Sequence, residues 1–326
     1  MSSTPVSINE TSSTPPTSEF GYSASQGADW SRYLAYRPIY PPSFFARIYA
    51  YHAQKKQLRG GGGGWSVAHD VGAGCGIVAA GLASRFERVM VSDPNEGYTE
   101  LARTLLLGGE SSSLLDAKFR FLRERAEGGS SSIATASVDL VAACECIQWT
   151  DADAAIAEFA RQLRAGGTLA VTFYTRPNVV GHGEAAAAAW AALVRARAPH
   201  EQGPEYDAPY RIGNSGLDCL RFPAEDWVDV KRMYFNARGS TGAFALDDRV
   251  GEARVGEGEE QVWIEDEKDW CHVRGIDWFK GFFSTWVPYI PESKLRGLWD
   301  DFERALGGQK VSTETPLVMI FATKRA

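Results

Sequence analysis

The stretch HDVGAGCGIVAAGLASRF, residues 69–86, decides the fold class that we expect for this chain. Gly72, Gly74 and Gly76 stand at alternate positions, between an apolar run typical of a strand and an Ala-rich run typical of a helix. Glycine lets the backbone turn sharply, and it lets a ligand touch the backbone without a Cβ in the way. A helix that begins at such a loop also presents unpaired N–H groups to a polar ligand. The stretch therefore predicts a nucleotide-like ligand at the carboxyl end of the first strand.

Strand and helix patterns alternate around this loop. The strand-like runs are residues 65–71, 88–93, 117–124, 138–145 and 167–174, with two more at 227–235 and 315–325. The helix-like runs among them are residues 76–86, 96–107, 151–164 and 184–198. Such alternation is typical of a mostly parallel sheet with helices on both faces. We therefore predict an α/β fold: a Rossmann-like, doubly wound sheet of seven mostly parallel strands, with a helical and aromatic cap formed by insertions.

The domain organisation follows from shifts in composition. Residues 1–28 are rich in Ser, Thr, Pro and Gly, so they have little to bury and are expected to form a disordered tail. The remaining residues, 29–326, are expected to form a single domain with a cofactor-binding core at about 65–175. The cap on the substrate side is expected to come from residues 29–58 and about 176–310. Within the cap, the aromatic run 265–290 has a helical pattern, and the acidic stretch 247–269 is expected to be exposed.

Composition and charge argue against several classes of function. The net charge of −7 disfavours nucleic-acid binding, which needs a basic patch. No apolar run reaches the ~18–20 residues that cross a bilayer, and the N-terminus lacks the pattern of a signal peptide. The cysteines have no framework or zinc spacing, and His182, His200 and His272 are isolated, so we predict reduced thiols and no metal. We expect a cytoplasmic protein, monomer or homodimer, that acts on a small molecule without nucleic acid or membrane partners.

The spacing of the glycines distinguishes two kinds of nucleotide site. The dinucleotide fingerprint is G-x-G-x-x-G, whereas the third glycine here comes one position too early for a typical NAD site. With an acid in front, DVGAGCG resembles motif I of class I S-adenosylmethionine-dependent methyltransferases. In that family the glycines pack against the methionine part and the ribose of the cofactor. The resemblance implies cofactor contacts for the residues Asp70, Gly72, Ala73, Gly74 and Gly76. An NAD-linked oxidoreductase on a similar sheet stays a less favoured alternative.

A carboxylate after the second strand supports this interpretation independently. A ribose binder needs an acid about 20 residues beyond the glycine loop, to accept hydrogen bonds from two hydroxyls. RVMVSDPNEGY, residues 88–98, supplies Asp93 at that point, followed by Pro94. A capping role for Asp93 at the next helix is the alternative. Together with the glycine loop, the acid favours a ribose site.

Two later segments extend the resemblance. FRFLRERAEG, residues 119–128, contains Ala126 and Glu127, which are similar to the short acidic motif that borders the adenine in this family. Residues 138–174 resemble the strand, the helix and the glycine turn that follow it there. This implies that residues 144–149 line the sulfonium end of the cofactor, with Cys144 and Glu145 in contact with it.

Short motifs narrow the resemblance to the trans-aconitate methyltransferase-like group, also called methyltransferase type 11. These are YRPIYP at 36–41, Trp149, and FFSTWVPY at 282–289. That group methylates small carboxylic acids and varied metabolites. It often has His before the Trp, whereas this chain has Gln148, which cannot act as a base near neutral pH. An ionised carboxylate needs no base, but a phenol or an alcohol does. The resemblance therefore implies methyl transfer from S-adenosylmethionine to a small acceptor, most readily O-methylation of a carboxylic acid or related metabolite.

The acceptor side is expected to be aromatic. Because the cofactor carries the reactivity, the protein mainly aligns donor and acceptor, and we assign no catalytic residue. The candidates for positioning the acceptor are Arg37, Tyr40, Gln148, Trp149, Trp286 and Tyr289. Tyr36 and Arg37 are also candidates for the cofactor, since an arginine among aromatics suits a carboxylate of either molecule. Packing in the core is the alternative for each aromatic residue. A relative that binds the cofactor with no methyl transfer, or that uses the pocket for another reaction, stays an alternative for the function.

Overall fold

The structure is a computed structural model that describes residues 28–58, 64–108, 117–128 and 132–326. Except for Ala28, the predicted disordered tail lies outside these residues.

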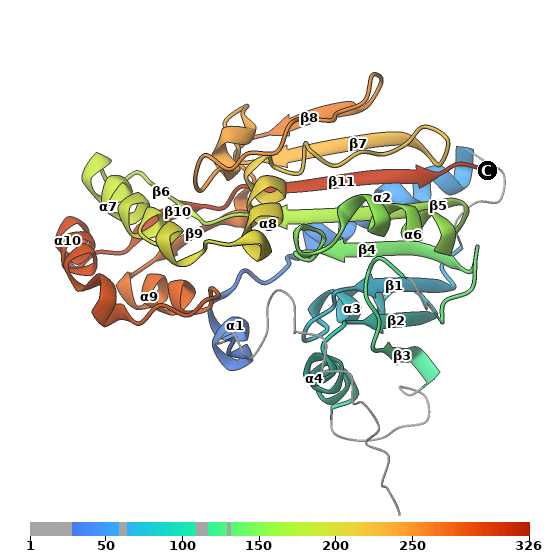
Figure 1. Ribbon diagram of the computed structural model, residues 1–326, viewed down its shortest axis with the longest axis horizontal. Helices are drawn as coiled ribbons and strands as arrows, with labels where there is room; N and C mark the ends of the chain where they lie inside the picture. The colour runs from blue at the N-terminus through green and yellow to red at the C-terminus, as the bar shows by residue number, and fades with distance from the viewer. Residues whose placement is uncertain (1–27, 59–63, 109–116, 129–131) are drawn as a thin grey trace, which may run out of the picture.

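A sheet of eight strands forms the centre of the molecule, in the order β3-β2-β1-β4-β5-β11-β7-β8 (Figure 1). Its strands are β1 (Val67–Val71), β2 (Arg88–Ser92), β3 (Phe119–Leu122), β4 (Val138–Cys144), β5 (Leu163–Tyr174), β7 (Trp227–Phe235), β8 (Glu260–Ile264) and β11 (Leu317–Lys324). Neighbours in the sheet run parallel except that β11 is antiparallel to both β5 and β7. The chain builds outward from β1 to β3 and then in the opposite direction from β4, so a switch point lies between β1 and β4. In open α/β sheets, ligands bind at this point.

The predicted fold class is confirmed, and the sheet has one strand more than predicted. The additional strand, β8, lies within the acidic stretch that we expected to be exposed. It pairs with β7 at the edge of the sheet, and its side chains are exposed or half-buried. The Trp263 ring of β8 stacks on Tyr234 of β7, with 4.1 Å between the ring centroids. Because this edge strand buries little, its sequence lacks the apolar run that marks the other strands.

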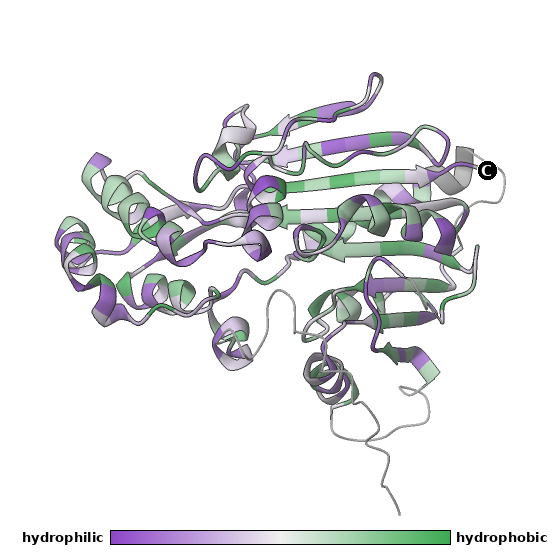
Figure 2. Cartoon of the chain, viewed as in Figure 1, coloured by the Kyte–Doolittle hydropathy of each residue, from purple (hydrophilic) through white to green (hydrophobic). Residues whose placement is uncertain are grey.

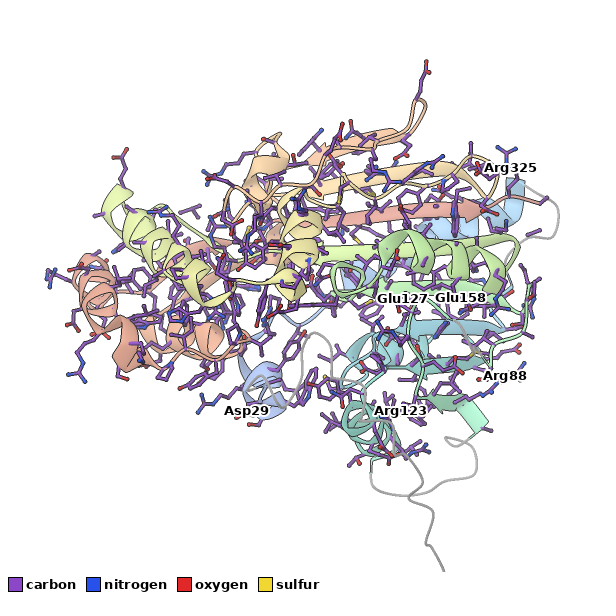
Figure 3. The ribbon with its side chains drawn as sticks, viewed as in Figure 1. Asp29, Arg88, Arg123, Glu127, Glu158 and Arg325 are labelled. Carbon is purple, nitrogen blue, oxygen red and sulfur yellow. The ribbon has the colours of Figure 1, made fainter. Side chains whose placement is uncertain are left out.

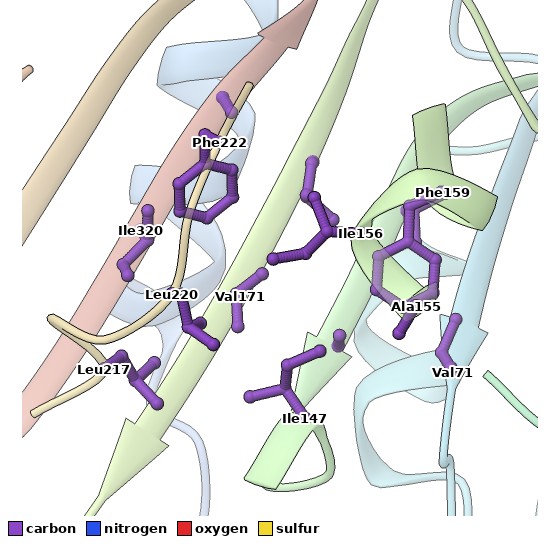
Figure 4. Close-up of a cluster of buried hydrophobic side chains, with 14 of the residues drawn as sticks. Val71, Ile147, Ala155, Ile156, Phe159, Val171, Leu217, Leu220, Phe222 and Ile320 are labelled. Carbon is purple, nitrogen blue, oxygen red and sulfur yellow. The ribbon is translucent and has the colours of Figure 1, made fainter. Parts of the chain in front are cut away.

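Helices cover both faces of the sheet. On one face lie α2 (Pro42–Leu58), α3 (Ile77–Leu82) and α4 (Glu96–Leu107), and on the other lie α6 (Ala152–Gln162) and α8 (Pro204–Asn214). Figure 2 shows that β4, β5 and β11 are hydrophobic along most of their length, as expected for strands covered on both faces. Figure 4 shows Ile156 of α6 beside Val171 of β5, and Phe159 of the same helix on the side of Val71 of β1. Residues 42–58, which we expected in the cap, therefore form a helix on the sheet.

A cap extends beyond the carboxyl ends of the central parallel strands, at the left of Figure 1. It contains a three-stranded sheet, in the order β6-β10-β9, with the strands β6 (Asn178–Val180), β9 (Cys271–Arg274) and β10 (Val311–Glu314). Its helices are α7 (Glu184–Arg195), α9 (Ile276–Ser284) and α10 (Arg296–Leu306), and α1 (Trp30–Tyr36) contacts α9. Short 3-10 turns connect the elements: η2 (Ile147–Trp149), η3 (Ala198–His200), η4 (Thr241–Phe244), η5 (Lys268–Trp270) and η6 (Glu292–Leu295). The helical run expected over 265–290 is thus divided into η5, β9 and α9.

Aromatic side chains hold the cap together. Trp190 of α7 contacts Phe279 of α9 at 4.9 Å and Phe302 of α10 at 5.7 Å between ring centroids. Trp299 of α10 packs on Phe283 of α9 at 5.3 Å. This cluster is separate from the clusters on the two faces of the main sheet. None of the described helices combines the length and the apolar composition needed to span a membrane.

Candidate active site

A cavity of about 970 Å³ opens where β1, β2, β4 and β5 end, at the switch point of the sheet. The loops after these strands form one side of it, and α1, α8 and the segment after α9 form the other. The segment after β3 also reaches it; Figure 3 labels Arg123 and Glu127 of this segment. Its volume is at the upper end of the roughly 300–1,000 Å³ typical of small-molecule sites. The cavity therefore has room for a cofactor together with an acceptor.

The glycine loop forms the floor of the cavity directly after β1. Gly72 and Gly74 have positive φ angles of 60° and 53°. A Cβ on Gly72 would lie 2.4 Å from the Cβ of Cys146, and one on Gly74 would lie 2.8 Å from the ring of Trp30. Both glycines are therefore required by conformation and by space. Ala73 also lines the cavity, as predicted for this loop.

Asp70 lies at the end of β1 and connects the strand to α3. Its carboxylate accepts a hydrogen bond of 2.8 Å from the backbone N–H of Ala79. Burial raises the pKa of Asp70 to about 8, and the nearby charge of Asp93 adds to this shift. The side chain lines the cavity and at the same time fixes the first turn of α3 against the sheet.

Asp93 follows β2 and joins two loops of the cavity. Oδ2 accepts the N–H of Gly74 at 3.1 Å, and Oδ1 accepts the N–H of Asn95 at 2.9 Å. Asn95 is the N-cap residue of α4, so Asp93 binds the residue before the helix and does not itself cap α4. Burial raises the pKa of Asp93 to about 6, although these two hydrogen bonds act in the opposite direction. Pro94 lines the cavity beside it.

The segment after β3 brings Ala126 and Glu127 to the cavity, as predicted. Glu127 accepts a hydrogen bond of 3.0 Å from the N–H of Asp151, the residue that caps α6. This hydrogen bond connects the segment after β3 to the start of α6. The side chain of Arg125 also donates to Glu127, at 3.4 Å.

The end of β4 contributes Cys144 and Glu145, followed by η2. Glu145 has a positive φ of 57°, and its Oε1 accepts the N–H of Tyr174 at 2.5 Å. Burial raises the pKa of Glu145 to about 8, against the effect of this bond and of the Arg37 charge. Gln148 is buried, and its Nε2 donates to the carbonyl of Glu145 at 3.1 Å. The strained turn therefore places an acidic side chain at the wall of the cavity.

Arg37 closes the cavity from the N-terminal side. It follows α1, and its Nε donates to Oγ1 of Thr285 at 2.8 Å, next to α9. The guanidinium lies 5.3 Å from the ring centroids of both Tyr33 and Phe282. Tyr40 lines the cavity too, with its ring 4.4 Å from that of Phe44 in α2. The arginine is thus held among aromatics, as the sequence predicts, and is placed between the core and the cap.

The sequence analysis missed most of the residues that the cap contributes. We call these residues the cap wall: Thr175, Arg176, Glu201, Tyr206, Tyr210, Leu246, Phe282 and Trp286. Of these, only Trp286 was among our candidates. The two tyrosines stand on α8, a helix whose sequence includes Pro209 and Gly213 and therefore gives no clear helical signal.

Three of the predicted residues do not line the cavity. Tyr36 packs on α9, where a Cβ on Gly281 would lie 2.3 Å from its ring. Tyr289 is 43% exposed, with the guanidinium of Arg32 at 5.8 Å from its ring centroid. Gly76 begins α3, and a Cβ there would lie 2.9 Å from the side chain of Leu106. These positions serve helix packing or lie at the surface. Within the described part of the chain, no group of three or more His, Cys, Asp or Glu side chains could hold a metal ion.

Comparisons with known proteins agree with this geometry. A family model described as a methyltransferase domain matches residues 69–171. The methyltransferase cfoB of Aspergillus candidus is 33% identical over 316 residues, which are 90% of this chain and 94% of that protein. The methyltransferase pgmE of Aspergillus terreus is 31% identical over 319 residues, with 90% and 93% coverage. A provisionally assigned type II methyltransferase from Anaeromyxobacter dehalogenans shares the fold, with a TM-score of 0.52 at 20% identity over 87% of this chain and 97% of that one.

The chain belongs to the methyltransferase family. Within it, the protein is a class I enzyme that uses S-adenosylmethionine, as the sequence predicted. This membership replaces the alternative of an NAD-linked oxidoreductase. The residues present fit the cofactor: the glycine loop lines the cavity at the switch point, and a buried carboxylate follows β2. When bound, S-adenosylmethionine supplies an electrophilic methyl group on a sulfonium, and its bond to sulfur breaks as an acceptor atom bonds to the carbon.

Proposed function

We propose that the enzyme methylates a carboxylate oxygen of a small carboxylic acid and forms its methyl ester. The observation that carries this proposal is Arg176, which follows β5 and lines the cavity. Its Nη1 donates to the carbonyl of Ala245 at 3.3 Å, and it makes no ion pair with any of the described residues. Burial and the charge of Arg195 lower the pKa of Arg176. A partly buried cation without a counter-charge favours an anionic ligand, and the guanidinium matches the geometry of a carboxylate.

The residue before Trp149 supports a carboxylate as the acceptor group. Gln148 is buried at the cavity and cannot remove a proton near neutral pH. A carboxylic acid is already ionised at that pH, so its oxygen needs no base. What the protein must then provide is alignment of donor and acceptor, which is the contribution expected from Arg176 and the cap wall.

We further propose how the cavity residues hold the cofactor. Asp93 accepts hydrogen bonds from the ribose, the glycine loop receives the methionine part, and the segment with Ala126 and Glu127 borders the adenine. Arg37 and Glu145 suit the two charges of the methionine part, the carboxylate and the ammonium. In support, Arg37 is close enough to Glu145 to lower its pKa, and both line the same cavity as Asp93.

The domain assignment remains a proposal as well. We infer that residues 29–326 act as one domain, in which about 65–175 binds the cofactor and the cap positions the acceptor. Cavity-lining residues from both parts support this: Asp93 follows a core strand, while Trp286 follows α9 of the cap.

The test is a screen of carboxylic acids, phenols and amines with S-adenosylmethionine labelled in the methyl group. We expect labelled products that release methanol in alkali, because methyl esters hydrolyse there while aryl ethers and methylamines do not. The Arg176→Gln variant should lose at least tenfold in kcat/KM for the acid, while its affinity for S-adenosylhomocysteine stays unchanged. Products that are stable in alkali, or an unchanged kcat/KM in the variant, would contradict the proposal.

A further inference from the structure

Aromatic side chains from three elements gather on the acceptor side of the cavity. Trp149 belongs to η2, Tyr206 and Tyr210 belong to α8, and Trp286 follows α9. The rings of Trp149 and Tyr206 meet edge to face, with 6.4 Å between their centroids and 73° between their planes. They join η2 at the end of β4 to α8, and η2 and α8 are in contact along this side.

A buried ion pair fixes α8 relative to the segment after α9. The Nε atom of Arg197 donates to Oε1 of Glu201 at 2.7 Å, and both side chains are almost completely buried. The same guanidinium lies 5.0 Å from the ring centroid of Trp286, and its Nη2 donates to the carbonyl of Pro288 at 3.0 Å. Because Glu201 comes shortly before α8, the pair holds Trp286 and the tyrosines of α8 in one arrangement.

The rings at the cavity differ from those that only pack the cap. Trp190 and Trp299 are each 2% exposed, lie among the cap helices and do not line the cavity. Trp149 and Trp286 remain half-buried and line it. Rings that line the cavity can contact a ligand there, whereas the rings of the cap core are covered by the cap helices.

We propose that the acceptor is a planar aromatic carboxylic acid, with its ring against Trp149, Tyr206 and Trp286 and its carboxylate at Arg176. This rests on the proposed function and narrows it to a substrate class. Aromatic pairs prefer edge-to-face or offset-stacked arrangements, and their attraction exceeds that of equal apolar area. For each ring contact this corresponds to about two- to tenfold in affinity over a saturated ring of the same size.

The experiment compares two acids that share one carbon skeleton. 2-Naphthoate is flat and aromatic, whereas decahydro-2-naphthoate has the same carboxylate on a saturated, puckered ring system. Calorimetric titration of each acid into the full chain saturated with S-adenosylhomocysteine gives a ratio of the two dissociation constants. We expect naphthoate to bind at least about fivefold more tightly.

Substitutions show whether the cavity rings produce this ratio. Trp149→Leu and Tyr206→Leu should each reduce the preference to about twofold or less, whereas Trp149→Phe should retain most of it. The matched control is Trp263→Leu on the edge strand β8, which lies outside the cavity and should leave the ratio unchanged. Unchanged affinity for S-adenosylhomocysteine identifies the variants that are still folded.

Equal affinity for the two acids, failure of both to bind, or a ratio that survives both leucine variants would overturn the inference. Methyl-transfer assays distinguish failure of this inference from failure of the proposed function. If 2-naphthol rather than 2-naphthoate is methylated, the ring preference stands and the assignment of the carboxylate falls. If both acids are esterified equally well, the carboxylate assignment stands and the aromatic class falls.

Discussion

The Asp93 carboxylate accepts a hydrogen bond from the backbone N–H of Gly74 at 3.1 Å, so the acid after β2 is joined directly to the glycine loop after β1. These residues are separated by 18 intervening positions in the chain, and the parallel pairing of β1 with β2 brings them together. The bond uses one oxygen of the carboxylate, and a second bond from Asn95 uses the other. The acid therefore has a fixed orientation before any ligand arrives.

Asp93→Ala should weaken the binding of S-adenosylmethionine about ten- to a thousandfold. Hydrogen bonds to a charged group contribute about 1.5–3 kcal/mol each, and the two bonds from the ribose to one carboxylate add less than fully. Calorimetry with S-adenosylhomocysteine measures the loss. Asp226→Asn is the control, since this acid pairs with Lys324 at the end of β11 that lies away from the cavity. Unchanged affinity in Asp93→Ala would show that the ribose is bound elsewhere.

The glycine loop and Asp93 could be predicted because each depends on a short stretch of sequence directly after a strand. The parallel sheet then brings such stretches to one edge. The cap wall could not be predicted in this way. Arg176 follows β5, Tyr206 stands on α8 and Trp286 follows α9, so these residues meet only through tertiary packing. Tyr36 shows the reverse error: it belongs to a recognisable motif, but its ring packs on α9.

The stability of the ligand-free protein should fall as the pH rises from about 4 to about 8. Asp70 has a pKa raised to about 8 by burial, against 3.8 for the solvent-exposed carboxyl of the unfolded chain. Between these two pKa values the folded state keeps a proton on Asp70 that the unfolded state has released. The resulting stabilisation is fully present below the pKa of the unfolded chain and is lost as the pH rises through the pKa of the folded protein. Melting temperatures across this range measure the effect. Asp70→Asn should have a flatter profile, and identical profiles would contradict the prediction.

Deletion of residues 1–27 should leave the melting temperature nearly unchanged. A segment of this composition buries too little to offset the entropy of ordering it. The deletion also preserves the start of α1, because Asp29 accepts the N–H groups of Ser31 and Arg32 at 3.0 and 3.2 Å. Figure 3 shows Asp29 at the outer side of α1. A loss of many degrees on scanning calorimetry would mean that the tail docks on the domain.

Two roles for Arg37 can be distinguished by experiment: it binds the cofactor, or it orients the acceptor. It is fixed to Thr285 beside α9, and its charge acts on Glu145 at the end of β4. If Arg37 holds the carboxylate of the methionine part, Arg37→Gln should weaken S-adenosylhomocysteine binding at least tenfold, as Asp93→Ala does. If it orients the acceptor instead, the variant should bind the cofactor normally and lose turnover.

We expect the first result, because we propose Arg176, which lines the same cavity, as the cation that binds the acceptor. Arg32→Gln is the matched control: this arginine belongs to α1, which Arg37 directly follows, but it lies at the surface beside Tyr289. Calorimetry with S-adenosylhomocysteine and methyl-transfer rates, measured on both variants, distinguish the two roles. Wild-type affinity together with a reduced kcat in Arg37→Gln would assign the residue to the acceptor. Wild-type values for both would show that the arginine serves only to fasten the N-terminal segment to the cap.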